Sequence, residues 1–204
     1  MEIFGMERYF RCWRFAWLLL ALLPLSGRAQ DKVQWTTNYY RVGGDMLPEI
    51  HQSLREGRPW KGKSAQDGLT DWRVEWRFEL RRSENGCQIH QFTTTTTIVI
   101  TLPRWTASTN AAPGVRQKWA RYIAALNQHE AGHAKIGLAV AAELRKQVEK
   151  IREEQSCETL KETLNALGWR VVDDFKTKDK DYDRTTQHGA MQGARLPFAP
   201  RPNQ

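Results

Sequence analysis

The chain has 204 residues and a formal net charge of +8, from 31 Lys and Arg against 23 Asp and Glu. This length is enough for one compact domain with a substantial core and is short for two. The basic residues are scattered among acidic ones, as in Arg152-Glu153-Glu154, so no dense basic tract indicates a nucleic-acid-binding protein. We therefore expect a single domain without a nucleic-acid partner.

The first 29 residues have the pattern of a secretory signal peptide. Three arginines precede an apolar run over residues 15–25, which is shorter than a bilayer span. Gly27 and Ala29 are the small residues of a cleavage site, so we expect residues 1–29 to be removed. The mature protein is then periplasmic or secreted, without stable membrane insertion. An uncleaved membrane anchor is the alternative, because two tryptophans extend the apolar stretch towards the N-terminus.

The cysteines predict one disulfide bond. Cys12 lies in the predicted signal peptide, which leaves Cys87 and Cys157 as a pair in a chain sent to an oxidising compartment. We expect these two to be bonded to each other; the alternative is a pair of buried free thiols.

The mature chain is expected to begin with a strand and a short helix. Residues 33–42 are rich in Trp, Thr and Tyr and predict a β-strand that stops at Gly43-Gly44. A short helix is expected over residues 47–54, followed by a loop region over residues 57–68.

The next two runs predict a β-hairpin. Residues 72–80 alternate strictly between apolar and charged side chains, which is the period of a half-buried strand. Residues 87–102 are rich in threonine and β-branched side chains, and Pro103 is expected to end this strand. A turn signal, Glu84-Asn85-Gly86, separates the two runs, so we expect them to pair antiparallel.

A long helix is predicted over residues 115–155. Its apolar stripe includes Trp119, Tyr122, Leu126, Val140, Leu144 and Val148. At about 100° per residue, Glu130 and His133 fall inside this stripe and His129 lies at its border. These three side chains are therefore expected to face the interior or a cleft.

The C-terminal part of the chain gives weaker signals. A second, short helix is expected over residues 158–167, ended by Gly168-Trp169. The chain after it is polar and loop-like up to residues 182–189. The proline-rich tail, residues 194–204, is expected to be poorly ordered, so the predicted domain spans residues 30–193.

The sequence His129-Glu130-Ala131-Gly132-His133 predicts a zinc (Zn2+) site on the long helix. Residues four apart lie one turn above each other, so both imidazoles can reach the same ion. Glu130 is then the candidate general base that takes a proton from the attacking water. The alternative is that the two histidines are hydrogen-bonded core residues and that Glu130 is their neighbour.

A catalytic zinc site also needs a third protein ligand. Glu153 is excluded, because an unbroken helix would carry it about 30 Å from the two histidines. His188, in a polar and glycine-flanked segment that can fold back over the helix, is the predicted third ligand. Asp183 is the second choice, or else a partner that orients an imidazole, and His90 is an outsider. Tyr182 is predicted to donate a hydrogen bond to the developing oxyanion, with simple packing as its alternative.

Four segments of the sequence carry a family resemblance. They are Thr101-Leu102-Pro103-Arg104-Trp105, the His129 to His133 pattern, the positions of Cys87 and Cys157, and the segment from Tyr182 to Gly189. With these segments the chain resembles the predicted secreted zinc proteases known as domain of unknown function 922, over roughly residues 39–193. The resemblance implies a zincin-like peptidase whose substrate is unsettled, and it is consistent with a third ligand at His188.

The expected fold is α+β and zincin-like, with a small antiparallel sheet packed on a long helix that carries the histidines. The strand over residues 93–101 is expected to be a sheet edge that holds the substrate backbone. The expected function is a secreted or periplasmic zinc-dependent peptidase that acts on peptides, proteins or cell-wall peptides. A non-catalytic, metal-containing envelope protein that binds peptide or cell-wall polymer is the alternative. Nickel, copper and cobalt also suit two imidazoles, and zinc is preferred among them.

Overall fold

The computed structural model of the chain describes residues 31–60, 66–106 and 109–197. The predicted signal peptide, residues 1–29, lies outside the described residues, as does most of the predicted tail. Among the helices that are described, none is both long and apolar enough to cross a membrane.

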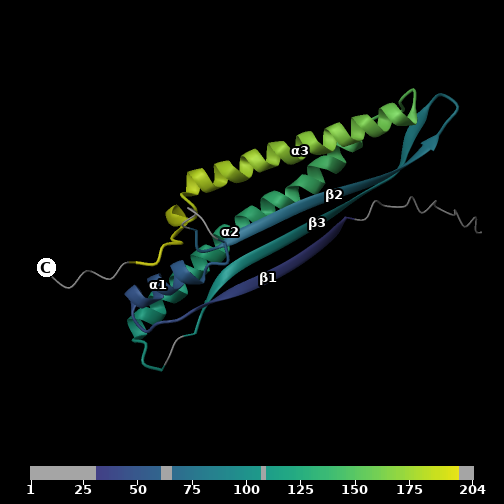
Figure 1. Ribbon diagram of the computed structural model, residues 1–204. Helices are drawn as coiled ribbons and strands as arrows, with labels where there is room; N and C mark the ends of the chain where they lie inside the picture. Colours follow the sequence, from purple (N-terminus) through teal and green to yellow (C-terminus); the bar gives the residue numbers. More distant parts are fainter. Residues whose placement is uncertain (1–30, 61–65, 107–108, 198–204) are drawn as a thin grey trace, which may run out of the picture.

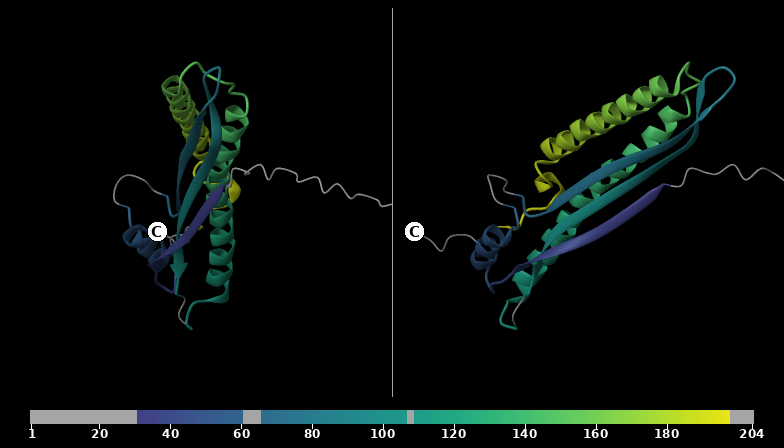
Figure 2. Two further views of the ribbon diagram at one scale, coloured as in Figure 1. Left: turned by 90° about the vertical axis from the view of Figure 1, so that its right-hand side faces the viewer. Right: turned by 45° about the vertical axis from the view of Figure 1, so that its right-hand side comes forward.

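The described chain is an α+β structure in which two long helices lie along a small sheet (Figure 1). Its elements are β1 (Lys32–Val42), α1 (Leu47–Gly57), β2 (Leu69–Arg82), β3 (Cys87–Trp105), α2 (Pro113–Val148), α3 (Cys157–Thr186) and the short 3-10 helix η1 (Ala190–Gln192). α2 runs along the strands and α3 returns beside it, while α1 lies at the far end from the α2–α3 connection (Figure 2).

The three-stranded sheet has the order β1-β3-β2 and is mixed, which corrects the expected antiparallel sheet. The predicted hairpin is confirmed, because β2 and β3 pair antiparallel. β1 pairs with β3 in parallel. After β1, the chain passes through α1 and enters the sheet again at the other edge as β2. The hairpin turn then leads into β3, which lies between β1 and β2 and runs parallel to β1.

β3 is the central strand, so the expectation that residues 93–101 form a sheet edge is wrong. Thr96, for example, pairs with Val33 of β1 on one side and with Val74 of β2 on the other. Its backbone hydrogen bonds are therefore used within the sheet, and the free edges belong to β1 and β2.

Pro103 does not end β3, which continues to Trp105. The pairing with β2 reaches only to Leu69 and Thr101, whereas the pairing with β1 continues through Tyr40 and Pro103. Pro103 thus has a strand on one side only. Proline is tolerated at such an edge position because its missing N–H leaves no ladder bond unmade.

Both helices differ in length from the expectation. α2 ends at Val148, earlier than predicted, and α3 runs without a break to Thr186, although Gly168-Trp169 was expected to end it. A side chain at Gly168 would collide with the Trp76 ring of β2, so this glycine allows α3 to lie close against the sheet. The Trp76 indole N–H also donates to Asn165 Oδ1 at 3.2 Å. Packing of this kind offsets the weak helix propensity of a single glycine.

The buried side chains form two clusters, one towards each end of the molecule. The first joins α1, the ends of β1 and β3 and the N-terminal half of α2. The second joins β2, the first part of β3, the C-terminal half of α2 and α3. Leu196, which belongs to the predicted tail, is buried in the first cluster. The core therefore extends beyond the predicted domain boundary at Gly193.

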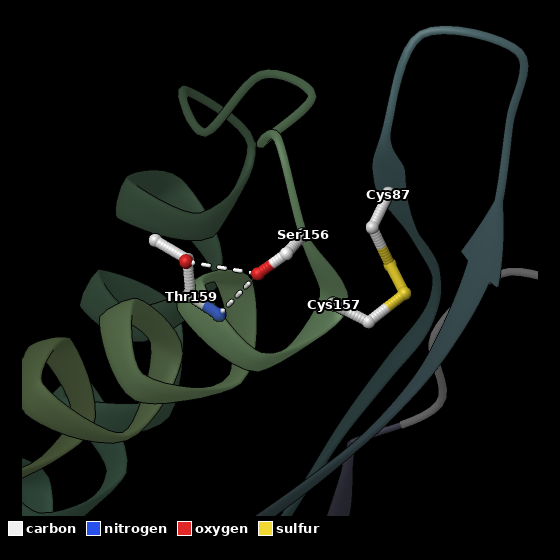
Figure 3. Close-up of a disulfide and its surroundings, with 4 residues drawn as sticks. All are labelled: Cys87, Ser156, Cys157 and Thr159. Atoms are coloured by element: carbon white, nitrogen blue, oxygen red, sulfur yellow. Dashed lines mark hydrogen bonds between the residues drawn. A yellow bond between two sulfur atoms is a disulfide. The ribbon is translucent and has the colours of Figure 1, made fainter.

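The predicted disulfide between Cys87 and Cys157 is confirmed (Figure 3). It joins the first residue of β3 to the first residue of α3, and backbone hydrogen bonds between Cys87 and Glu154 lie beside it. Ser156 caps α3, because its Oγ accepts a hydrogen bond from the Thr159 N–H (Figure 3). The start of α3 is thereby fixed to the β2–β3 hairpin.

Replacing both cysteines with serine is expected to lower the free energy of unfolding by about 4 kcal/mol, because the bond closes a long loop in the unfolded chain. The two cysteines are 70 positions apart. Urea denaturation of the two proteins measures the difference, and the unaltered protein under a reducing agent serves as the control. Equal midpoints for the oxidised protein and the variant would show that the disulfide does not stabilise the fold.

Candidate metal centre

Two pairs of polar side chains face each other between α2 and α3. His129 and His133 of α2 are four residues apart, and so are Asp179 and Asp183 of α3. In a helix this spacing places both members of a pair on one face. The histidines are almost fully buried, with 2% and 6% of their surfaces exposed.

Three of these side chains bring one donor atom each to a common point. The Nε2 atoms of His129 and His133 are 3.3 Å apart, and each lies 3.1 Å from Asp183 Oδ1. In a tetrahedral zinc site, ligand bonds of about 2.0–2.1 Å place neighbouring ligand atoms about 3.3 Å apart. The donor types and their separations therefore fit a zinc ion held by His129, His133 and Asp183.

The other ring nitrogen of each histidine is held by a partner. Asp179 Oδ1 lies 2.8 Å from His133 Nδ1, and Gln192 Oε1 lies 2.9 Å from His129 Nδ1. Such hydrogen bonds fix the ring orientation and leave Nε2 directed at the donor cluster. Sequence reasoning missed both partners. The four-residue spacing of the aspartates was the available signal for Asp179, whereas nothing in the sequence pointed to Gln192.

The charges around His133 favour a cation at this position. Burial lowers the pKa of His133, but hydrogen bonds to Asp179 and Asp183 and the charges of those carboxylates outweigh it and raise the pKa to about 10. For Asp183 the effects have the opposite signs. Burial raises the pKa of this carboxyl group, but its hydrogen bonds with His129 and His133 outweigh burial and hold the pKa well below its usual range. Asp183 therefore remains ionised, as a metal ligand must be.

Glu130 lies beside the donor cluster and is buried, with 3% of its surface exposed. Its Oε2 accepts a hydrogen bond from the Thr70 hydroxyl at 2.7 Å, which ties the carboxyl group to the start of β2. Gly68 leaves room for the same group, because a side chain there would collide with it. Burial raises the pKa of Glu130, and the Thr70 hydrogen bond offsets only part of that rise.

Tyr182 packs inside the site. Its ring stacks on His129 with a centroid distance of 5.1 Å and an interplanar angle of 14°. Its hydroxyl donates to the backbone oxygen of His129 at 3.3 Å and accepts from Gln192 Nε2 at 3.0 Å. A side chain at Gly132 would collide with that hydroxyl, so the glycine allows α3 to approach α2 here. The Tyr182 hydroxyl, which is expected from the sequence to donate to an oxyanion, thus has two partners inside the protein.

The other predicted ligands lie in different places. His188 follows the end of α3 in a left-handed conformation and is half exposed, and its Nδ1 is 3.1 Å from Asp183 Oδ1. It therefore reaches the donor cluster through Asp183 and also contacts Gln66. His90 is exposed on β3, where its Nε2 lies 3.0 Å from an Arg81 nitrogen. His90 is outside the group of three donors.

A cavity of about 770 Å³ opens beside the donor cluster. His129, Glu130 and His188 are among the residues that line it. The candidate base and one donor histidine are thus reachable from a space large enough for several residues of a peptide.

One protein family matches residues 37–189, which is more than half of the chain. Its description is "Bacterial protein of unknown function (DUF922)". The chain belongs to this family. The match includes the histidines of α2 and the aspartates of α3, so the donor cluster lies inside the region that defines the family. No curated protein and no solved structure gives a significant match.

Asp179→Asn is expected to weaken zinc binding about 10-fold to 100-fold, because the amide orients His133 less firmly than the carboxylate does. Competition with a chromophoric chelator measures the affinity. Asp174→Asn is the matched control, since Asp174 is exposed on the same helix and should leave the affinity unchanged. Equal affinities for the two variants would mean that Asp179 has no part in metal binding.

Proposed function

We propose that this protein is a secreted or periplasmic zinc-dependent peptidase that hydrolyses amide bonds with an activated water molecule. The observation that carries the proposal is the meeting of two imidazole nitrogens and one carboxylate oxygen at mutual distances of 3.1–3.3 Å, with a buried glutamate beside them. Three protein donors and an open position are the arrangement of a catalytic zinc site. A structural zinc site would instead be closed by four protein ligands.

His129, His133 and Asp183 are the proposed ligands, with Asp179 and Gln192 holding the two rings. When bound, a zinc ion supplies a Lewis acid that polarises the scissile carbonyl and lowers the pKa of water. Imidazole and carboxylate donors suit zinc, and as ligand types they also suit cobalt or nickel. Zinc is preferred because the separations match tetrahedral coordination.

Glu130 is the proposed general base. Its position next to His129 in sequence, and its burial beside both imidazoles, place it within the charge environment of the ligands. A carboxyl group with a raised pKa can take a proton from the attacking water and then deliver it to the leaving amine. The Thr70 hydroxyl holds one oxygen of the group, so the other remains for the proton transfers.

The free edge of β2 is the proposed place for the substrate backbone. β2 is an edge strand, and its second residue, Thr70, contacts Glu130. Leu69, the first residue, is 40% exposed. An extended peptide that pairs with this end of β2 would lie beside the base, which is how sheet edges commonly bind peptides.

The disulfide supports a location in an oxidising compartment, because such bonds are rare in the bacterial cytosol. The signal-like sequence of residues 1–29 supports the same location.

Glu130→Gln is expected to keep zinc binding and to lower kcat about 10²-fold to 10⁴-fold, because the amide cannot accept the proton. Turnover of a peptide library by the zinc-loaded proteins, with and without a chelator, measures the effect. Glu143→Gln makes the same chemical change elsewhere on α2 and serves as the control. Full turnover by the Glu130 variant would remove the assignment, and zinc binding without hydrolysis of any peptide by the unaltered protein would favour the non-catalytic alternative.

Asp183→Ala is expected to lose tight zinc binding, because it removes one of three donors, whereas His188→Ala is expected to keep it. Isothermal titration with zinc compares the two variants, and His90→Ala, on the exposed part of β3, is the control. Loss of binding in the His188 variant, with retention in the Asp183 variant, would assign the third ligand to His188.

A further inference from the structure

The cavity beside the candidate base is bounded on one side by α1. His51, Leu54 and Arg55 line it from that helix, and their spacing of three and four residues places them on one face. Leu54 is buried in the first core cluster, which anchors this face. The cavity therefore has one wall, formed by α1, whose position is fixed by the core.

The C-terminal segment forms a second part of the lining. Arg195 and Leu196 line the cavity, and the burial of Leu196 fixes this segment against the core. His51 Nε2 lies 3.3 Å from the backbone oxygen of Pro197, which ties the segment to α1. Arg195 is thus held beside the same cavity as Arg55.

The cavity lining carries an excess of positive charge. Arg55, Arg58 and Arg195 contribute guanidinium groups, and the carboxylates are those of Asp67 and Glu130. Asp67 is already engaged, because it accepts hydrogen bonds from Arg58 Nε at 3.0 Å and from the Tyr122 hydroxyl at 2.8 Å.

Arg55 and Arg195 are both exposed, and over residues 31–60, 66–106 and 109–197 neither forms an ion pair with an acidic side chain. Two arginines beside one cavity attract a carboxylate more strongly than a neutral group, because guanidinium groups bind carboxylates in a matched, bidentate geometry. Leu54 and Leu196, next to them in sequence, are buried in the first core cluster and fix the backbone that carries each arginine.

We propose that this cavity selects peptides that carry a carboxylate near the scissile bond, and that Arg55 and Arg195 determine the selection. The carboxylate belongs either to an acidic side chain or to the C-terminus of the peptide. This inference rests on the proposed peptidase function, since it names the substrate class of the same site.

The test uses the mature full-length chain, loaded with zinc, and four labelled peptides of one sequence. The peptides carry either Glu or Gln at one position, and each has either a free or an amidated C-terminus. Binding is measured by fluorescence anisotropy with the Glu130→Gln variant, so that the readout does not depend on turnover. The values of kcat/KM for the same four peptides are measured with the unaltered protein.

A peptide with the favoured carboxylate is expected to bind about fivefold to tenfold more tightly than its neutral counterpart at low salt, and this preference should shrink at high salt. Combining Arg55→Gln with Arg195→Gln should abolish the preference, whereas combining Arg55→Lys with Arg195→Lys should keep only part of it, because lysine retains the charge and loses the bidentate geometry. Arg82→Gln, at the disulfide end of β2, removes a positive charge far from the cavity and should change nothing. The pairwise comparison of the peptides shows which carboxylate is recognised.

Equal binding of all four peptides, or a preference that persists in the variant with two glutamines, would overturn the inference. If the unaltered protein still hydrolyses peptides in that case, the peptidase function stands without it. If arginine-dependent binding is found and no peptide is hydrolysed, the peptidase function fails and the carboxylate selectivity of the cavity stands.

Discussion

The structure depends on the electrostatic balance among ionisable side chains buried between two packed helices. α2 contributes His129, His133 and Glu130, and α3 contributes Asp179 and Asp183. Burying such groups costs free energy unless each has a partner of opposite charge or a hydrogen bond. The imidazole–carboxylate contacts supply that compensation, and a bound cation would complete it. An apolar side chain in place of Asp183 would remove the carboxylate partner of both Nε2 atoms, and one in place of Asp179 would remove the partner of His133 Nδ1.

The rest of the fold fixes the separation of α2 and α3. The disulfide and the backbone hydrogen bonds between Cys87 and Glu154 hold the start of α3 on the β2–β3 hairpin. Gly168 lets α3 lie against Trp76, and Gly132 lets the Tyr182 ring enter between the helices. The donor atoms meet near the other end of α3, so small changes of helix packing along its length would displace them. A metal site tolerates only a few tenths of an ångström in its ligand distances.

The site joins two regions of opposite electrostatic character. On the α3 side, carboxylates surround the imidazoles and favour a cation. On the α1 side, Arg55 and Arg195 line the cavity and favour an anion. Glu130 belongs to both regions, because it lines the cavity and interacts with the charges of His129 and His133, and Thr70 of the sheet holds its carboxyl group. In the proposed peptidase, a peptide bound through its carboxylate on the α1 side would present an amide bond to Glu130 and the proposed metal ligands.

The sequence by itself determined the features that depend on residues close together in the chain or on a count of one residue type. The period of a helix puts the two histidines of α2 on one face, alternation predicts the hairpin, and the cysteine count predicts the disulfide. It could not give the parallel pairing of β1, because the crossover through α1 is a property of the whole chain. The helix predicted from the sequence stops before Gly168, whereas α3 continues through it, because the packing of Gly168 against Trp76 is visible only in the tertiary structure. With that helix broken, Asp179 had no predicted face, and Gln192 meets His129 across 63 positions of sequence. Only the tertiary structure brings these partners together, since contacts between distant segments leave no periodic signal in either segment.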